Sequence, residues 1–222
     1  MEKGLEKVPE RRRTVLVTGG TVRIGLAIAE RLRASGWRVM TSSHRHDAGA
    51  DIVVDLSRPD GAAKLYSAAL AMLGGEPPDA IVNNAALLAG DDAAVECVNL
   101  AAPQKLTILM AGRETGRGSV VNVLDAQSDA SVPGRSPVYA ETKRALRGYT
   151  LKSAAMFAGT LRVNAVEPGP VLAPVSMHEK AGETPLGRPR PEDVAEAVEF
   201  LLGAGATTGA ILPVDGGLHL FT

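Results

Sequence analysis

The sequence predicts an α/β fold: a single doubly wound domain with a seven-stranded parallel sheet flanked by helices. Short β-branched apolar runs alternate along the whole chain with segments of helical length. This alternation is typical of parallel strands joined by crossover helices. The chain has 222 residues, which is enough for one well-buried domain, and no low-complexity linker divides it.

The first half of the chain supplies four of the expected strands and two helices. The strands are expected at 14–17, 37–42, 51–56 and 80–86, the last with its following turn. A helix is predicted over 24–34, where apolar residues recur at helical spacing and Gly36 follows the end. A second helix is predicted over 59–73, and the turn GGEPP stops it.

The second half continues the alternation with three further strands and three helices. The helices are expected around 93–112 and over 137–158 and 191–202, and the strands over 119–125, 161–169 and 210–217. Pro103 marks a joint in the first of these helices, because proline removes a helical hydrogen bond. The last helix has a proline in its first turn and Gly203 after its end, as helices often do.

Composition and charge exclude several classes of function. The formal net charge is -1, which does not favour a general nucleic-acid binder. No apolar run approaches the ~20 residues of a membrane span, so no membrane partner is expected. Cys97 is the only cysteine, which rules out an internal disulfide and fits a cytoplasmic protein.

Residues 1–13 are expected to form a flexible basic N-terminal tail, and residues 14–222 the folded domain. The tail lacks the apolar core of a signal peptide. It ends in three arginines at 11–13, which we interpret as solvated. A basic docking patch is the alternative interpretation of these three residues.

The stretch TVLVTGGTVRIG, residues 14–25, predicts a strand that leads into a phosphate-binding turn. Gly19 and Gly20 follow the strand, and Gly25 lies in the first turn of the next helix. Backbone amides at a helix start suit a pyrophosphate, and ligands of doubly wound sheets bind beyond the carboxyl ends of the strands. Arg23 stands where a further glycine would be expected.

Other motifs follow in a fixed order along the chain. NNAA (83–86) ends the fourth strand, EPG (167–169) ends the sixth, and YAETK (139–143) places Tyr139 and Lys143 on one helix face. Together with the glycine turn, these motifs resemble the short-chain dehydrogenase/reductase superfamily over about residues 14–218. The resemblance implies a Rossmann-type domain that binds a nicotinamide cofactor.

The cofactor is expected to lie along the strand ends. By resemblance, Asn83 and Ala85 neighbour the cofactor and Asp55 contacts the adenine. The full set of residues expected to bind the cofactor is Gly19, Thr21, Arg23, Ile24, Gly25, Ser43, His44, Arg45, Asp55, Leu56, Asn83, Ala85, Lys143, Pro168 and Gly169.

The end of the second strand favours NADPH (NADP+) over NAD. Sheets that bind NAD usually carry an acidic residue there, whereas this chain has Ser43, His44 and Arg45. Arg45 can pair with a 2'-phosphate, and the hydroxyl of Ser43 can donate to it. Asp47 comes later and, by folding back, would keep NAD as the alternative.

The predicted catalytic residues are Tyr139, Lys143, Asp125 and Asn99. A phenol has a pKa of about 10 in water, and a nearby lysine cation lowers it. Tyr139 is therefore the expected general acid in the reducing direction. Lys143 also suits the nicotinamide ribose hydroxyls. By resemblance, Asn99 organises its helix and a water that relays protons to Lys143.

Four features resemble the pteridine reductases and the bacterial dihydromonapterin reductases. They are Arg23, the segment SHRH (43–46), Asp125 and the tail DGGLHL (215–220). Arg23, Asp125 and Tyr139 are accordingly expected to contact a pterin-like substrate. Most superfamily members have a serine at the place of Asp125, and a carboxylate there can instead pair with the N–H groups of a pterin ring.

Two departures from that subgroup keep alternatives open. Asp125 lies 14 residues before Tyr139, where the family usually shows about 13, so Ser128 or Ser131 is an alternative donor. Leu87 and Leu88 follow the fourth strand, where pteridine reductases supply an aromatic ring. The segment 170–190, with Met177 and His178, is expected to cover the substrate or to form a surface loop.

The predicted function is an NADPH-dependent reductase that acts on a dihydropterin or a related small-molecule ring. The alternative enzyme is an NADPH carbonyl reductase acting on 3-oxoacyl thioesters or other ketones. A cofactor-sensing protein without turnover is the alternative from another class. By resemblance we also expect a homotetramer built on helices 93–112 and 137–158, and no metal site.

Overall fold

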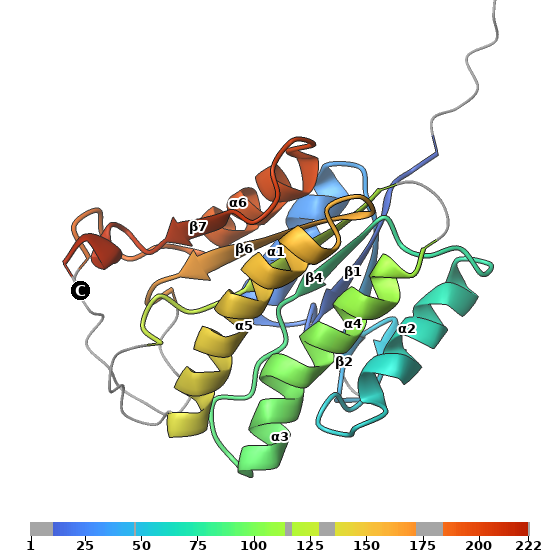
Figure 1. Cartoon of the computed structure of the whole chain (residues 1–222), viewed down its shortest axis with the longest axis horizontal. Helices are drawn as coiled ribbons and strands as arrows, with labels where there is room; N and C mark the ends of the chain where they lie inside the picture. Colours follow the sequence, from blue (N-terminus) through green and yellow to red (C-terminus); the bar gives the residue numbers. More distant parts are fainter. Residues whose placement is uncertain (1–10, 47, 114–116, 129–135, 172–183, 222) are drawn as a thin grey trace, which may run out of the picture.

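Seven parallel strands form the centre of the protein in the order β3-β2-β1-β4-β5-β6-β7, which confirms the predicted fold class (Figure 1). The computed structural model describes residues 11–46, 48–113, 117–128, 136–171 and 184–221. The strands are β1 (Thr14–Thr18), β2 (Arg38–Ser43), β3 (Ile52–Val53), β4 (Ala80–Asn83), β5 (Gly118–Val123), β6 (Leu161–Pro168) and β7 (Ile211–Val214).

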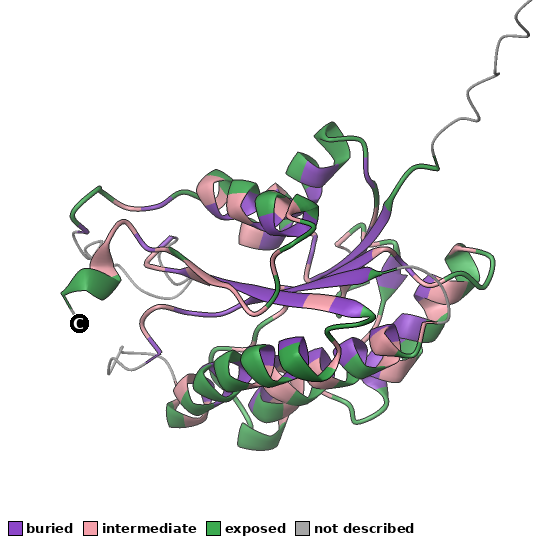
Figure 2. Ribbon diagram, turned by 45° about the horizontal axis from the view of Figure 1, so that its top comes forward, coloured by how far each residue is buried: buried purple, intermediate pink, exposed green. Residues whose placement is uncertain are grey.

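Helices cover both faces of this sheet, as Figure 2 shows. α1 (Arg23–Ala34) and α6 (Pro191–Gly203) pack on one face. α2 (Gly61–Met72), α4 (Ala102–Ala111) and α5 (Pro137–Met156) lie on the other. The described part also contains a short α3 (Asp92–Glu96), a π-helical turn (Cys97–Ala101) and a 3₁₀ turn (Leu218–Leu220).

The core follows from the alternation of side chains along the strands. Val15 and Val17 point to the α1 and α6 side, whereas Leu16 points to the α2 and α4 side, and all three are fully buried. A strand buried on both faces needs a continuous apolar run, and TVLV supplies it. The packing of these side chains thus fixes the register of β1 against its neighbouring strands. The glycine turn begins at the residue after β1.

The helix expected at 93–112 is interrupted. It consists of α3, the π-helical turn and α4, and the amide of Ala102 bonds to the carbonyl of Cys97, five residues earlier. Pro103 has no N–H to donate to the carbonyl of Asn99, four residues before it. The predicted joint therefore falls in the turn that precedes the proline, and this turn carries Asn99.

The third strand is shorter than the predicted 51–56, since β3 covers only Ile52–Val53. Aspartates flank the strand at both ends, and their side chains bond to β2 and to the turn that follows. The Oδ2 atom of Asp51 accepts from the amide and hydroxyl of Thr41, at 2.7 and 2.8 Å. The Oδ1 atom of Asp55 accepts from the amide and hydroxyl of Ser57, at 2.9 and 2.7 Å.

Arg11, Arg12 and Arg13, at the end of the predicted tail, lie against the domain. Arg11 pairs with Asp79 at 2.5 Å, and Nε of Arg12 donates to the carbonyl of Gly36 at 2.7 Å. The guanidinium of Arg13 lies 4.2 Å from the centre of the Trp37 ring. The boundary between tail and domain stays a prediction. None of the described helices is long and apolar enough to cross a membrane.

Candidate active site

The strand order reverses at β1, which pairs with β2 on one side and β4 on the other. The turns after β1 and β4 leave toward opposite faces, and such a switch opens a crevice at the carboxyl edge. The two turns are tied together, because the hydroxyl of Thr18 accepts from the amides of Asn84 and Ala85 at 2.9 and 3.0 Å. Gly19 has a φ of 62°, and a Cβ there would lie 3.1 Å from Cα of Ala85.

The start of α1 fits a phosphate group. Its N-cap, Val22, makes no side-chain cap bond, and its first turn holds no acidic residue. The first amides of a helix need acceptors, and the helix dipole favours an anion there. A Cβ on Gly25 would lie 2.1 Å from the carbonyl oxygen of Gly19, so the close turn requires glycine. These features fit the pyrophosphate of a dinucleotide.

Arg23 is the first residue of α1 and has a φ of 55°, in the left-handed region that favours glycine. This conformation costs a residue with a Cβ about 1–2 kcal/mol. The side chain of Arg23 is exposed at the phosphate end of the crevice. Strain of this kind, in a residue that carries a cation, is typical of functional sites.

The residues predicted for the adenine end lie together. Ser43 ends β2, and its hydroxyl accepts from the amide of Arg45 at 3.1 Å. Hydrogen bonds from Ser57 lower the pKa of Asp55, and the charges of Arg58 and His44 add to this effect. Asp47, on which the NAD alternative rested, lies outside the described residues.

Two predicted cofactor residues turn their side chains into the core. Leu56 is 7% exposed and belongs to the apolar cluster on the α2 and α4 side. Nδ2 of Asn83 donates to Oδ1 of Asn122 at 2.8 Å, beneath the strand ends. Thr21, in the turn after β1, is half-buried.

Tyr139 and Asp125 are in direct contact. The phenol of Tyr139 donates to Oδ2 of Asp125 at 2.7 Å, and the two residues are 4% and 8% exposed. The hydroxyl of Ser136 caps α5 by accepting from the amide of Tyr139 at 3.1 Å. The cap fixes the first turn of α5, which brings the phenol to the end of β5.

Lys143 lies one turn further along α5 and is 3% exposed. Its ammonium donates to the carbonyl of Val123 at 2.7 Å and lies 5.8 Å from the centre of the Tyr139 ring. A buried cation at this distance stabilises a phenolate more than a solvated one, because the surroundings screen it less.

Asn99 holds the turn after β4. Its Oδ1 accepts from the amide of Leu87 at 2.8 Å, and its Nδ2 donates to the carbonyl of Leu87 at 2.9 Å. Nδ2 also reaches the hydroxyl of Thr142, which donates to the carbonyl of Tyr139. Asn99 thus links the β4 turn to the first turn of α5.

The alternatives for the second polar group were Asp125, Ser128 and Ser131. Asp125 contacts the phenol, and its Oδ1 accepts from the amide of Gln127 at 2.8 Å. Ser128 is buried, and its amide donates to the carbonyl of Asp125 at 3.1 Å. Ser131, Met177 and His178 lie outside the described residues.

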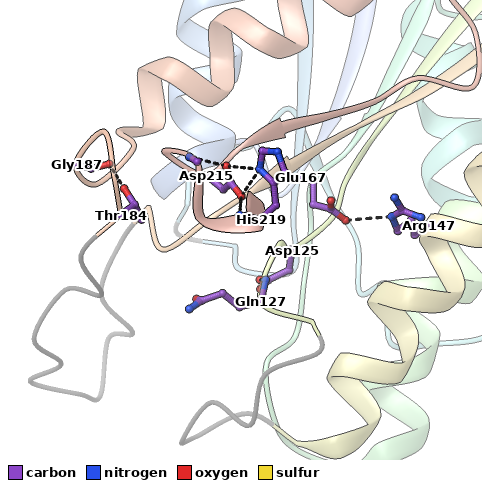
Figure 3. Close-up of polar contacts among 9 residues, drawn as sticks. Asp125, Gln127, Arg147, Glu167, Thr184, Gly187, Asp215 and His219 are labelled. Atoms are coloured by element: carbon purple, nitrogen blue, oxygen red, sulfur yellow. Dashed lines mark hydrogen bonds and ion pairs between the residues drawn. The ribbon is translucent and has the colours of Figure 1, made fainter. Parts of the chain in front are cut away.

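Two further carboxylates at the strand ends were missed by the sequence reasoning. They are Glu167 and Asp215, which Figure 3 shows together. Glu167 precedes Pro168 and pairs with Arg147 at 3.4 Å. Burial raises the pKa of Glu167, and the charges of Asp215 and Asp125 raise it further. The sequence did contain a signal for both carboxylates, because the motifs EPG and DGG lie at the ends of expected strands.

The reacting end therefore combines a phenol, a buried ammonium and a row of carboxylates. The phenol can give a proton to a substrate atom, and the ammonium can stabilise the phenolate that remains. Within the described residues, no group of three or more histidine, cysteine, aspartate or glutamate side chains is arranged to hold a metal ion.

Comparison with known proteins agrees with this geometry. A family model described as Enoyl-(Acyl carrier protein) reductase matches residues 21–219. A granaticin polyketide synthase protein of Streptomyces violaceoruber, named ketoacyl reductase 2, is 34% identical and covers 92% of this chain and 95% of its own. L-xylulose reductase of Cavia porcellus is 33% identical over 92% of this chain and 96% of its own.

The fold also matches a solved structure. The ligand-free aldohexose dehydrogenase of Thermoplasma acidophilum superposes with a TM-score of 0.83 at 27% identity, and 96% of each chain is covered. Members of this family use NAD(P) cofactors, in agreement with the glycine turn and the Tyr139–Lys143 pair. The chain belongs to the short-chain dehydrogenase/reductase superfamily and is an oxidoreductase of that type.

Proposed function

We propose that the protein is an NADPH-dependent reductase of a dihydropterin or a related nitrogen-containing ring. The observation that carries this proposal is the 2.7 Å bond between the phenol of Tyr139 and the carboxylate of Asp125. A carboxylate accepts hydrogen bonds and cannot donate them, so Asp125 suits a substrate rich in N–H groups. A carbonyl oxygen placed against the same carboxylate would be repelled.

The chain's own residues hold and move the proton. Bound NADPH would supply a hydride to the ring carbon of a C=N bond. Tyr139 would donate its phenolic proton to the ring nitrogen, so that one C–H and one N–H bond form. Lys143 would stabilise the phenolate until it is reprotonated, and Asp125 would hold the neighbouring N–H group of the ring.

The preference for NADPH rests on charge. His44 and Arg45 are exposed after β2, and the carboxylate of Asp51 is already bonded to Thr41. A ribose 2'-phosphate would pair with Arg45 and accept from Ser43. The start of α1, with Gly19, Gly25 and Arg23, would hold the pyrophosphate.

A carbonyl reductase is the second candidate, and one observation favours it. The relative that is 34% identical is named a ketoacyl reductase, and its similarity spans nearly the whole chain. In that function Tyr139 would donate to the carbonyl oxygen of a 3-oxoacyl thioester. Ser128 would then be the second donor to that oxygen, a role that the carboxylate of Asp125 cannot fill.

Replacing Tyr139 by phenylalanine tests the catalytic assignment. We expect Tyr139→Phe to lose at least about 10²-fold in kcat, since general acid catalysis contributes about that much or more. NADPH binding, followed by nicotinamide fluorescence, should stay within about threefold. Full turnover in the variant would contradict the role of Tyr139 and would favour a protein that binds the cofactor without catalysis.

We also propose a homotetramer in the cytoplasm. Ile108 on α4 and Leu151 on α5 are about half exposed, at 52% and 46%. Exposed apolar side chains on two neighbouring helices are typical of a surface covered by another subunit.

A further inference from the structure

A buried aspartate holds a histidine at the end of the sheet, next to the candidate active site. Asp215 follows β7 and is 2% exposed. Its Oδ1 accepts from the amide of Gly217 at 3.0 Å, and its Oδ2 accepts from the amide of His219 at 2.7 Å. Nδ1 of His219 lies 3.0 and 2.9 Å from the two carboxylate oxygens (Figure 3).

This arrangement determines which ring nitrogen is available. Burial raises the pKa of Asp215, but hydrogen bonds from His219 and Gly217 outweigh it and leave the pKa lowered. An ionised carboxylate only accepts, so Nδ1 of His219 carries the hydrogen. Nε2 then bears a lone pair in the neutral ring and donates when the ring is protonated. The side chain of His219 is 44% exposed, which leaves the ring accessible to a ligand.

The pair is continuous with the reacting end of the site. The amide of Ala126, next to Asp125, donates to the carbonyl of Pro168 at 2.9 Å. A Cβ on Gly169 would lie 2.8 Å from Cα of Asp215. The ends of β5, β6 and β7 are therefore in contact. Two strand spacings separate Asp125 from Asp215, about 10 Å, which is the reach of an extended small molecule.

An open cavity adjoins the same turn. It has a volume of about 350 Å³ and is lined by Thr184, Pro185, Leu218 and Phe221. The hydroxyl of Thr184 is bonded to the carbonyl of Gly187, so the wall is mainly apolar. A carbon skeleton fits against such a wall, and His219 follows Leu218 directly in the chain.

We propose that His219, oriented by Asp215, binds a hydroxyl group that the substrate carries away from its reacting centre. A hydroxyl donates to the neutral ring and accepts from the protonated ring, so it suits Nε2 in both states. A carboxylate would be repelled by Asp125, Glu167 and Asp215. This proposal rests on the proposed function, because it requires a substrate that is reduced beside Tyr139.

Two substitutions separate a substrate contact from a structural role. His219→Asn keeps a polar group near the place of Nδ1, where it can bond to Asp215, but has nothing at Nε2. His219→Gln places an amide near Nε2 and weakens the contact with Asp215. If His219 only holds the chain end, the asparagine rescues function; if it binds substrate, the glutamine does.

The experiment compares kcat/KM for paired substrates, one of which carries several hydroxyl groups that its partner lacks. One pair is a dihydropterin with a trihydroxypropyl side chain and its 6-methyl counterpart. The other pair, for the carbonyl alternative, is a ketopentose and 2-pentanone. The wild type should prefer the hydroxylated partner by roughly tenfold, the size of one hydrogen bond, mainly through KM. His219→Ala and His219→Asn should lose this preference, and His219→Gln should keep part of it.

Turnover without a preference for the hydroxylated partner overturns the assignment of His219 and leaves the proposed function intact. If the preference survives in His219→Asn, His219 has a structural role, and the proposed contact with a substrate hydroxyl is also overturned. The absence of turnover on all four compounds contradicts the proposed function, and the assignment that depends on it falls as well.

Discussion

At the scale of single residues, the proposed reductase activity depends on Arg23, Asp125 and Tyr139. Tyr139 and Asp125 are 14 positions apart in the sequence, and the structure joins them by one hydrogen bond. The motifs were sufficient to predict Tyr139, Lys143 and Asp125 as neighbours. They did not reveal the strained backbone of Arg23, since a dihedral angle is set by the turn as a whole.

Arg23→Gly tests whether that strain serves binding. Glycine relieves the left-handed backbone but adds freedom to the unfolded chain, so we expect a net stabilisation of about 0.5–1 kcal/mol. Loss of the cation should weaken NADPH binding about tenfold or more. Thermal unfolding and fluorescence titration measure the two effects. Arg23→Lys, which keeps the charge and the strain, is the control. Unchanged NADPH affinity in the glycine variant would contradict the role of Arg23.

At the scale of elements, the sequence predicted where strands and helices occur better than where they end. β3 is two residues long, and the aspartates that flank it, Asp51 and Asp55, bond through their side chains to Thr41 and Ser57. The joint at Pro103 was predictable from the missing N–H, but the π-helical form of the preceding turn was not. The proximity of Glu167 to Asp215 was missed because it depends on the pairing of β6 with β7, whereas the contact of His219 with Asp215 is local to the turn after β7.

The end of β6 gives a pH-dependent prediction. Because the pKa of Glu167 is raised above its ordinary value of 4.5, its ionisation destabilises the folded state. This loss is absent below the unfolded pKa and grows as the pH rises through the folded pKa. The melting temperature of Glu167→Gln should therefore gain on that of the wild type as the pH rises above the ordinary pKa of 4.5.

Asp193→Asn is the matched control for that series. Hydrogen bonds from Arg190 lower the pKa of Asp193, so its contribution is present above the unfolded pKa and is lost as the pH falls. This variant should therefore melt below the wild type by a constant amount above about pH 4, and the difference should shrink only at lower pH. Parallel behaviour of the two variants would contradict the assigned environment of Glu167.

At the scale of the whole molecule, the alternation of strands and helices predicted the parallel sheet and the helices on both of its faces, whereas the strand order came from the structure. The assembly was inferred from resemblance and from exposed apolar side chains on α4 and α5. Ile108→Glu with Leu151→Glu should reduce a tetramer to smaller species in light scattering, because buried unpaired charges are costly at an interface. A monomeric wild type would contradict the proposed assembly.

We propose that Asp125 selects a ring substrate with N–H groups. NADPH oxidation by the wild type and by Asp125→Ser, measured with a dihydropterin and with an acetoacetyl thioester, tests this selection directly. We expect the wild type to turn over the dihydropterin, and the serine variant to lose this activity and to gain activity on the thioester. Turnover of the thioester alone by the wild type would contradict the claim and would favour the carbonyl reductase.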